Sequence, residues 1–303
     1  IPQCPPAITE YREHLEGLPM NDSPDLFGLH PNADLAFRRS EAQLVFRTIL
    51  SVQPKASGGD AGETREDVVS KQVAQLLQQL PPGFDAMNVK KQLKQLGRSK
   101  PLTILLKQEV DRLQGVISRF QTDLSDLKLA IAGTTTMNEN LSQVLEAIYD
   151  GLVPPQWKAS SWHASSLGLW FGELLERYKQ LDSWLNKGRP AAYWFTGFFN
   201  PQGFLTGVRQ EITRAHDKEG WALDAVELVS TVMKESSESL EKGPTEGVYI
   251  YGMFLEGARW DVKQGVLAES LPKVLYCEMP LIHVTATNVS KKESHCYECP
   301  VYR

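Results

Sequence analysis

The sequence predicts an α+β protein, in which an N-terminal helical bundle with one long helix precedes a small antiparallel β region. Apolar residues recur at helical spacing through most of the sequence up to about residue 217. After residue 220 the apolar runs are short and rich in β-branched and aromatic residues, which is typical of strands. Because helices and strands are segregated rather than alternating, the class is α+β and not α/β.

Length and composition exclude several functional classes. The 303 residues include 42% hydrophobic and 23% charged residues, both ordinary for a globular protein, and form one large domain or two small ones. The net charge of −5 disfavours a nucleic-acid partner. No apolar run approaches the roughly 20 residues of a membrane span, so we expect no membrane partner. The first six residues lack the features of a signal peptide, and we interpret the start as cut from a longer protein.

Four helices are expected before the longest one. Thr9 begins a short helix that Pro19 ends, and residues 35–52 have apolar side chains on one side. Residues 64–80 form the third helix, which the Pro-Pro-Gly sequence at 81–83 ends. A fourth, short helix at 87–96 carries Met87, Val89, Leu93 and Leu96, with Gly97 as its C-terminal cap.

The clearest expected element is a helix over residues 102–131. Its apolar residues recur every three or four positions for 30 residues, which corresponds to about 45 Å of helix. Pro101 suits its first turn and Gly133 its end. It could be a coiled-coil arm or a core helix of a bundle, and the bulky Phe120 favours the bundle. The apolar residues are Leu102, Leu106, Val110, Leu113, Ile117, Phe120, Leu124, Leu127 and Ile131.

The second half of the sequence changes from helices to strands. Helices are expected at 136–149 and 167–185, and another from Pro201 to about His216. Strand-like runs are Tyr193–Phe195 and residues 248–255, 273–279 and 281–286. Many aromatic residues lie between Trp157 and Trp221; they could line a ligand pocket, but a packing seam between subdomains is the more common explanation.

No sequence motif indicates catalysis. The sequence has no Gly-x-x-x-x-Gly-Lys-Ser/Thr phosphate loop, no Gly-x-Ser-x-Gly elbow and no His-Glu-x-x-His pair. Acid pairs such as Asp123/Asp126 and Glu173/Glu176 are best explained as solvated helix faces. Cys296 and Cys299 have the spacing of half a zinc site, for which Cys277 and His283 could complete the ligands, but two structural cysteines are the simpler interpretation. We therefore expect no catalytic residue, no cofactor-binding residue and no metal ligand in this segment.

Four longer segments carry more information than any short motif. The first spans residues 18–34 and includes Asp-Leu-Phe-Gly-Leu-His-Pro-Asn-Ala-Asp. The second is Leu80–Asp85 together with the Gln108-Glu109 pair of the long helix. The third runs from Gly188 to Gly207, and the fourth from Glu246 to Asp261, continued by Glu269-Ser270 and residues 272–275. In this order they resemble the C-terminal domain family of dynein heavy chains, over nearly the whole sequence.

This resemblance implies a domain division. Residues 1–34 would be the end of the last AAA+ lid and the junction, residues 35–217 the helical part of the domain, and residues 218–303 its β part. The family domain continues with strands that complete a small barrel, so the β part would be truncated here, barrel-like but incomplete. We then expect the last strands to expose an unpaired edge that promotes self-association.

The resemblance also implies a function. Residues 220–224 are similar to axonemal dyneins, of the outer-arm type. The parent would be an ATP-driven, minus-end-directed microtubule motor in the axoneme of a cilium or flagellum, with ATP and Mg²⁺ bound upstream of this segment. The partners would be the AAA+ modules of the same heavy chain and, for the parent complex, microtubules and other dynein subunits. The segment itself would brace the AAA+ ring and tune its coupling.

Seven residues of the resembling segments are candidates for a structural seam. Gly197, Gly203 and Gly207 suit sharp turns or close packing, and the aromatic residues suit the seam between packed parts. The alternative function is a free-standing helical adaptor, or a small enzyme whose site has no recognised motif. The four aromatic candidates are Trp194, Phe198, Phe199 and Trp260.

Overall fold

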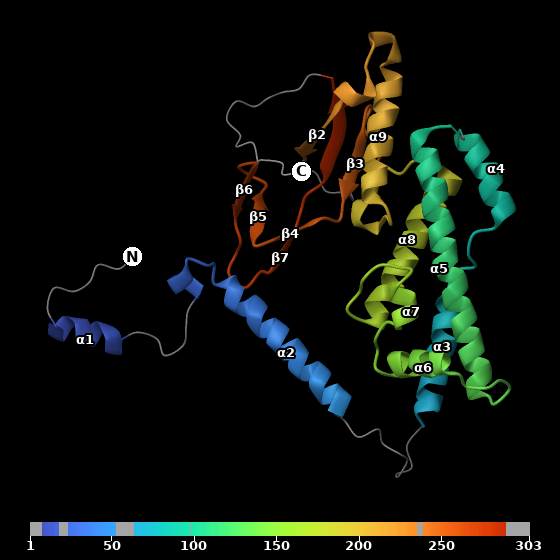
Figure 1. Cartoon of the computed structure of the whole chain (residues 1–303). Helices are drawn as coiled ribbons and strands as arrows, with labels where there is room; N and C mark the ends of the chain where they lie inside the picture. Colours follow the sequence, from blue (N-terminus) through green and yellow to red (C-terminus); the bar gives the residue numbers. More distant parts are fainter. Residues whose placement is uncertain (1–7, 18–23, 53–63, 98, 235–238, 289–303) are drawn as a thin grey trace. The chain divides into compact units, whose positions relative to one another are not determined.

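The computed structural model describes residues 8–17, 24–52, 64–97, 99–234 and 239–288. The protein forms two compact units (Figure 1). We call Ile1–Ser57 with Phe254–Met279 the hairpin unit, and Gly58–Met253 with Pro280–Arg303 the helical unit. The mixture of helices and small sheets confirms the α+β class. The boundaries of these units differ from those of the expected domains 1–34, 35–217 and 218–303. The assignment of those domains stays a prediction.

The hairpin unit combines helices from the start of the sequence with short strands from near its end. The strands form two antiparallel pairs, β4 with β7 and β5 with β6. The β5–β6 hairpin was not expected from the sequence. The helical elements are α1 (Ile8–Glu16), η1 (Pro24–Phe27) and α2 (Asn32–Val52), and the strands are β4 (Phe254–Glu256), β5 (Ala258–Asp261), β6 (Val266–Glu269) and β7 (Tyr276–Glu278).

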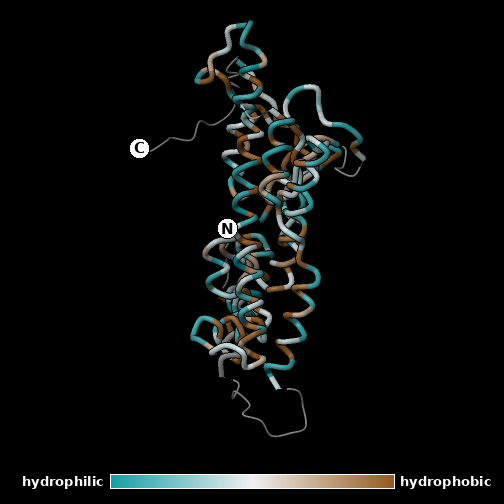
Figure 2. The backbone as a smooth tube through the Cα atoms, turned by 90° about the vertical axis from the view of Figure 1, so that its right-hand side faces the viewer, coloured by the Kyte–Doolittle hydropathy of each residue, from teal (hydrophilic) through white to brown (hydrophobic). Residues whose placement is uncertain are grey.

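The helical unit is a bundle arranged around the long helix α5. Helices α3, α4, α6, α7, α8 and α9 all contact it. Figure 2 shows hydrophobic and hydrophilic residues alternating along the helices, as amphipathic helices require. The helices are α3 (Arg65–Gln79), α4 (Ala86–Leu96), α5 (Pro101–Ile131), α6 (Glu139–Tyr149), α7 (Pro155–Lys158), α8 (Leu167–Lys187) and α9 (Pro201–Ala215), with short 3-10 turns η2 (Phe195–Gly197), η3 (Asp217–Glu219) and η4 (Leu223–Ala225).

Local signals set the ends of these helices. Thr64 and Asp67 form a reciprocal capping box at the start of α3. Pro101 occupies the first turn of α5, where its missing N–H is not needed. Gly97 follows α4 with a φ of 95°, which a glycine adopts without strain. Each of these ends lies within a few residues of its expected position.

The apolar stripe of α5 is the core of the helical unit. From Leu102 to Leu127, each of its expected apolar side chains is at most 2% exposed. The prediction of a bundle helix rather than a coiled-coil arm is therefore confirmed. In the described parts of the protein, no helix combines the length and apolar character needed to cross a bilayer.

A four-stranded sheet completes the helical unit. Its strands are β1 (Ala192–Trp194), β2 (Glu227–Val232), β3 (Val248–Tyr251) and β8 (Ile282–Thr287), in the order β1-β3-β8-β2. The β2–β8 and β3–β8 pairs are antiparallel, as expected for the β region, while β1, which precedes that region, runs parallel to β3. Helix α9 contacts β8, whose alternate residues Ile282, Val284 and Ala286 are buried.

The described strands form no closed barrel, and an incomplete one was expected. Three other expectations for the β region need correction. The last described strand, β8, is paired on both sides rather than exposed as an edge. The expected strand at 248–255 is divided at Gly252, whose φ of 84° bends the backbone between β3 and β4. The expected strand at 273–279 is shorter, covering only Tyr276–Glu278.

Candidate functional site

Two buried polar clusters join the segments that the sequence singled out. In the helical unit, Glu109 and Arg177 bring together parts of the second and third segments; we call this the Glu109–Arg177 cluster. In the hairpin unit, Asn32 joins the first segment to the end of the fourth; we call this the Asn32 network. Each cluster lies entirely within its own unit, so each can be described from its own contacts.

Glu109 fixes the start of α9 on α5. Its side chain is 1% exposed, and its two carboxylate oxygens accept hydrogen bonds from the backbone N–H groups of Phe199 (2.7 Å) and Asn200 (3.0 Å). Asn200 in turn caps α9, because its side-chain oxygen accepts from the N–H of Gly203 at 2.9 Å. A carboxylate at a helix N-terminus is also favoured by the helix dipole. The result is a rigid joint between two helices far apart in sequence.

Arg177 of α8 lies between two tryptophan rings. Its guanidinium carbon is 3.9 Å from the ring centre of Trp162 and 4.8 Å from that of Trp194, both within range of a cation–π interaction. One terminal nitrogen donates to the side chain (3.1 Å) and backbone carbonyl (3.2 Å) of Glu173, and the other to the carbonyl of Thr196 at 3.4 Å. This buried cation therefore fixes the turn after β1 to α8.

Trp194 is the point where the third and fourth segments meet. Gln180 binds the backbone of Trp194 in both directions: its side-chain oxygen accepts from the Trp194 N–H (2.7 Å) and its amide donates to the Trp194 carbonyl (3.3 Å). The indole packs against Gly197 and Gly252 so closely that a Cβ atom at either glycine would overlap it. The absence of a side chain is thus required at both positions.

The other candidate seam residues have different positions. Phe198 is buried and stacks on Phe204 with ring centres 4.7 Å apart, while the Phe199 ring meets the edge of Trp162 at 5.8 Å. Gly203 lies in the first turn of α9, against its Asn200 cap; Gly207, also in α9, faces Leu102 of α5. Trp260 belongs to the other unit: it is in β5 of the hairpin unit, where it is paired with Leu267 of β6.

The electrostatics of the Glu109–Arg177 cluster indicate a structural site. Burial raises the pKa of the Glu109 carboxyl, against the opposing effect of the hydrogen bonds from Phe199 and Asn200 and of the nearby Arg112 and Arg177 charges. Burial also lowers the pKa of Arg177. Both oxygens of Glu109 already accept backbone hydrogen bonds. The contacts of the cluster therefore position backbone segments.

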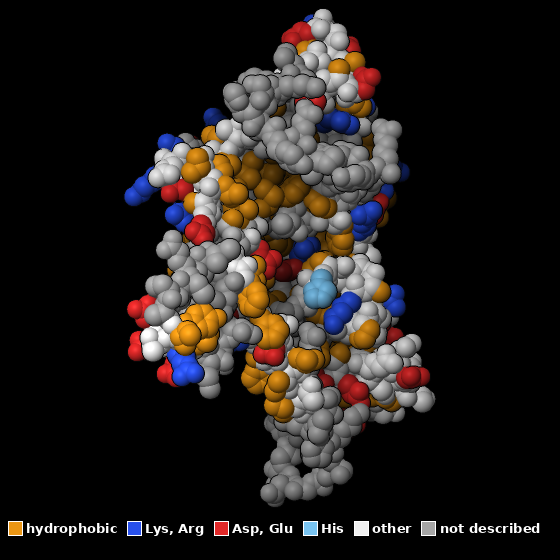
Figure 3. Space-filling model, turned by 60° about the vertical axis from the view of Figure 1, so that its left-hand side comes forward, with side chains coloured by type: hydrophobic (Ala, Val, Ile, Leu, Met, Phe, Trp, Pro, Cys, Tyr) orange, Lys and Arg blue, Asp and Glu red, His pale blue; other side chains and the backbone are white. Residues whose placement is uncertain are grey.

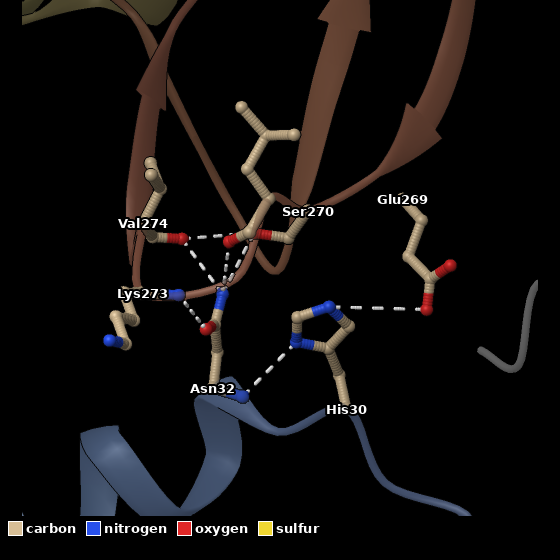
Figure 4. A network of polar contacts seen from close by, with 7 residues as sticks. His30, Asn32, Glu269, Ser270, Lys273 and Val274 are labelled. Atoms are coloured by element: carbon tan, nitrogen blue, oxygen red, sulfur yellow. Dashed lines mark hydrogen bonds and ion pairs between the residues drawn. The ribbon is translucent and has the colours of Figure 1, made fainter.

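The Asn32 network connects the start of α2 to the turn after β6 (Figure 4). The Asn32 amide nitrogen lies within hydrogen-bond distance of Ser270 Oγ (3.1 Å) and of the carbonyls of Leu271 and Val274 (2.9 Å each). Because the amide has two hydrogens, these three acceptors share them. The Asn32 oxygen accepts from the N–H of Lys273 at 2.7 Å. Asn32 is 7% exposed, so this one side chain organises the turn.

Two further features support the network. His30 Nδ1 accepts from the Asn32 backbone N–H at 3.1 Å, and His30 Nε2 lies 4.0 Å from a carboxylate oxygen of Glu269 (Figure 4). Lys273 has a φ of 67° and is the one non-glycine residue with a positive φ in the described ranges. Its unusual backbone is held by the bond to Asn32. His30 therefore has a structural role in this loop.

Sequence reasoning missed the residues at the centre of both clusters. Glu109 lies at a core position of the α5 stripe, three residues after Leu106, and Arg177 lies likewise on the α8 stripe, three after Leu174. Their sequence signal is a charged residue within an apolar helical stripe. Such a residue is expected to be buried, and a buried charge needs a partner. The Asn32 network had no comparable signal. Cys296 and Cys299 lie outside the described residues, and the described ones contain no group of three potential metal-ligating His, Cys, Asp or Glu side chains.

The comparisons with known proteins decide the family. The family model for the C-terminal domain of the dynein heavy chain matches residues 39–303. The protein belongs to this family. Dynein axonemal heavy chain 8 of Homo sapiens is 47% identical over 304 residues, and the match covers 100% of this sequence and 7% of that relative. The flagellar outer-arm dynein gamma chain of Chlamydomonas reinhardtii is 46% identical over 298 residues, covering 97% of this sequence and 7% of the relative.

The relatives also indicate the type of dynein. The flagellar outer-arm beta chain of Chlamydomonas reinhardtii is 34% identical over 304 residues, covering 98% of this sequence and 7% of the relative. Since these relatives are axonemal, the protein is of the axonemal dynein type, and its location is the axoneme of a cilium or flagellum. The sequence spans about 7% of the length of these relatives. The resemblance found in the four segments is confirmed.

Proposed function

We propose that this protein segment is a non-catalytic brace of an axonemal dynein motor. In this proposal the hairpin unit packs against AAA+ modules of the same heavy chain, and the helical unit is a second, rigid body. ATP and Mg²⁺ would be bound elsewhere in the heavy chain, which would move towards microtubule minus ends together with other dynein subunits. The brace would tune how ATP hydrolysis is coupled to movement.

The observation that carries this proposal is the exposed apolar surface of the hairpin unit. No described apolar side chain of this unit is buried, whereas large ones are open to solvent along α2 and the strands. Figure 3 shows hydrophobic side chains gathered in patches rather than lying singly. Contiguous exposed apolar surface marks an interface. On α2 the exposed residues are Leu35, Phe37, Leu44, Val45, Phe46 and Ile49.

The difference in sequence identity between two groups of relatives supports one type of dynein arm. The relatives at 46–47% identity include an outer-arm gamma chain, while the outer-arm beta chain and axonemal heavy chain 17 are at 34% and 36%. We therefore propose the gamma type of outer-arm heavy chain. Its partners would be those of an outer-arm complex.

A motility assay tests the brace. Phe37→Glu with Phe46→Glu, in the full-length heavy chain, should charge the α2 surface and loosen its packing against the ring. We expect gliding velocity per ATP hydrolysed to fall about fivefold, which corresponds to roughly 1 kcal/mol of lost coupling. Leu129→Glu, which charges an exposed residue of α5, is the matched control and should leave this ratio unchanged. If the α2 variant keeps the wild-type ratio, the brace is not at this surface.

A further inference from the structure

The helical unit has an open apolar groove between α4 and α5. Its volume is about 520 Å³. The floor is made by the buried side chains of Val89 and Leu93 on α4 and Val110 on α5, while Ile104 stands 47% exposed at one side. The other lining residues are Phe84, Ala86, Lys90, Thr103, Lys107, Asp111 and Gln114.

The length and form of the groove fit a helix rather than an extended strand. Its lining residues on α5 run from Thr103 to Gln114 at helical spacing, which is about 16 Å at 1.5 Å per residue. A groove between two helices with no free strand edge offers apolar side-chain contacts but no row of backbone hydrogen bonds. This is the geometry that takes the apolar face of an amphipathic helix, with anchors at i, i+3 or i+4, and i+7.

The charge around the groove identifies the kind of helix. Between Asp85 and Glu109 the sequence has five lysines and one arginine and no acidic residue, although the whole sequence has a net charge of −5. Lys90, Lys91 and Lys94 are exposed on α4 beside the groove. Lys107 is paired with Asp111 within α5, which leaves the α4 lysines to attract a partner. Complementary charge of this kind fixes specificity and accelerates association.

The rim also distinguishes this groove from the surface of the hairpin unit. Permanent interfaces resemble a domain core, and lysine is depleted in them, whereas reversible docking sites keep a charged rim. A lysine-rimmed groove of about three turns is therefore suited to a separate protein. We propose that the α4–α5 groove binds a short acidic amphipathic helix presented by another protein subunit, and not an upstream part of the same heavy chain.

Peptide binding tests the chemistry of the groove. The probe is a fluorescein-labelled synthetic helix of about four turns, with leucine on one face and glutamate elsewhere, titrated with the protein of residues 1–303 in fluorescence polarisation. We expect Ile104→Glu and Lys90→Glu each to weaken binding about tenfold, and added salt to weaken wild-type binding. Leu129→Glu and Lys128→Glu change exposed residues of α5 outside the groove and should have no effect.

A scrambled peptide of the same composition should not bind. Equal binding of the scrambled peptide, or equal affinity for the groove and control variants, would overturn the groove as the site. A lysine-for-glutamate version of the probe should bind more weakly than the acidic one, and tighter binding would overturn the assignment of charge.

Photo-crosslinking in the full-length heavy chain, assembled in its complex, tests the source of the helix. A photoreactive residue at position 104 should attach to an acidic helical segment of a different subunit, identified by peptide sequencing. Attachment to the heavy chain itself, or to a segment that is not acidic and helical, would overturn the proposal. The same residue at position 129 is the control for nonspecific capture.

Discussion

The helical unit and the hairpin unit are stabilised by different kinds of interaction. In the helical unit the stripe of α5 is buried by helices on several sides, and tryptophan and phenylalanine rings fill the spaces between them. The hairpin unit has short strand pairs, and among its described residues the buried side chains are the polar Asn32 and Ser270. One unit is thus held by an apolar core, and the other by hydrogen bonds around one asparagine.

This difference teaches where each unit obtains its stability. Burial of apolar area is the dominant favourable term in folding, and the helical unit has this term within itself. Isolated two-stranded pairs are marginal in water unless they pack against something else. The hairpin unit keeps its apolar side chains available for another surface. The proposed packing of this unit against AAA+ modules would use this available surface.

The largest expected effect is at the centre of the helical core. Phe120 is fully buried, with ring centres of Trp157, Trp170 and Phe171 within 5.7 Å. We expect Phe120→Ala to lower the free energy of unfolding of the protein by about 3–5 kcal/mol, because it leaves a cavity. Urea denaturation followed by tryptophan fluorescence measures this loss.

The matched variant lies in the hairpin unit. Phe46→Ala removes a ring that is 65% exposed, and the free energy of unfolding should change by at most about 0.5 kcal/mol. It should also reduce self-association in light scattering, because apolar surface is removed. If both phenylalanine variants were equally destabilised, the contrast between the units would be wrong.

Glu109 tests whether the helical core also depends on a buried charge. Glu109→Ala leaves two backbone N–H groups unpaired and removes a negative charge near Arg177, so we expect a loss of about 3 kcal/mol. Glu109→Gln keeps one acceptor and should lose less. Asp126→Ala, at an exposed position of the same helix, should change stability by at most about 0.5 kcal/mol. Equal values for Glu109→Ala and Asp126→Ala in urea denaturation would contradict the joint between α5 and α9.

Asn32 tests the hairpin unit, where we expect a local effect. Asn32→Ala removes every bond that the Asn32 side chain makes to the turn at 270–274, with a local cost of about 2 kcal/mol. The amide of Lys273 should then exchange with solvent roughly tenfold or more faster, while the urea midpoint of the helical unit stays the same. Asn32→Asp retains the acceptor for Lys273 but loses the donors, so its exchange rate should be intermediate. A shift of the whole unfolding transition would show that the two units are not separate in stability.

The smallest expected effect is a pH dependence within the helical unit. His216 Nε2 lies 2.7 Å from Glu246 and Nδ1 lies 2.9 Å from Glu219, and its ring stacks on Trp221 at 4.1 Å. The hydrogen bond to Glu219, which has the larger effect, and the hydrogen bond to Glu246 raise the pKa of His216. A raised histidine pKa stabilises the folded state. This contribution is fully present at pH values below the ordinary histidine pKa of about 6.5, and it is lost as the pH rises through the folded-state pKa.

His216→Gln should therefore lower the urea midpoint at pH 6 and leave it nearly unchanged at high pH. Measurements from about pH 6 to 9 give the difference between wild type and variant at each pH. A difference that grows as the pH rises would contradict the assignment of sign.

What could be predicted from the sequence was mainly local. The stripes of α5 and α8 identified helices because side chains three and four positions apart share one face, and Pro101 and Gly97 marked helix ends. The stripe of α2 was equally clear. Periodicity predicts that a helix has an apolar face, but it does not predict which part of the protein covers that face. The structure leaves this stripe exposed, and that exposure is the basis of the proposed function.

The arrangements that could not be predicted are all non-local. The parallel pairing of Ala192–Trp194 with Tyr249–Tyr251 joins two segments far apart in sequence, and no local pattern specifies it. The same is true of Asn32 and Ser270, which are separated by 238 positions. Asn32 and Ser270 both lie in the four segments that resemble the family, but the resemblance did not predict which residues of these segments are in contact. The two stripe charges, Glu109 and Arg177, were visible in the sequence, and their burial required partners that only the structure identifies.

The central position of β8 has a consequence for synthesis of the protein. Strand β2 leaves the ribosome well before β8, which separates it from β3 in the sheet. At about 5–20 residues per second, β2 must wait several seconds with its backbone groups unpaired. During this time it can pair with the same strand of a neighbouring nascent polypeptide on the same messenger RNA. We therefore expect newly made heavy chains to need chaperone protection at this point of translation more than at any helix.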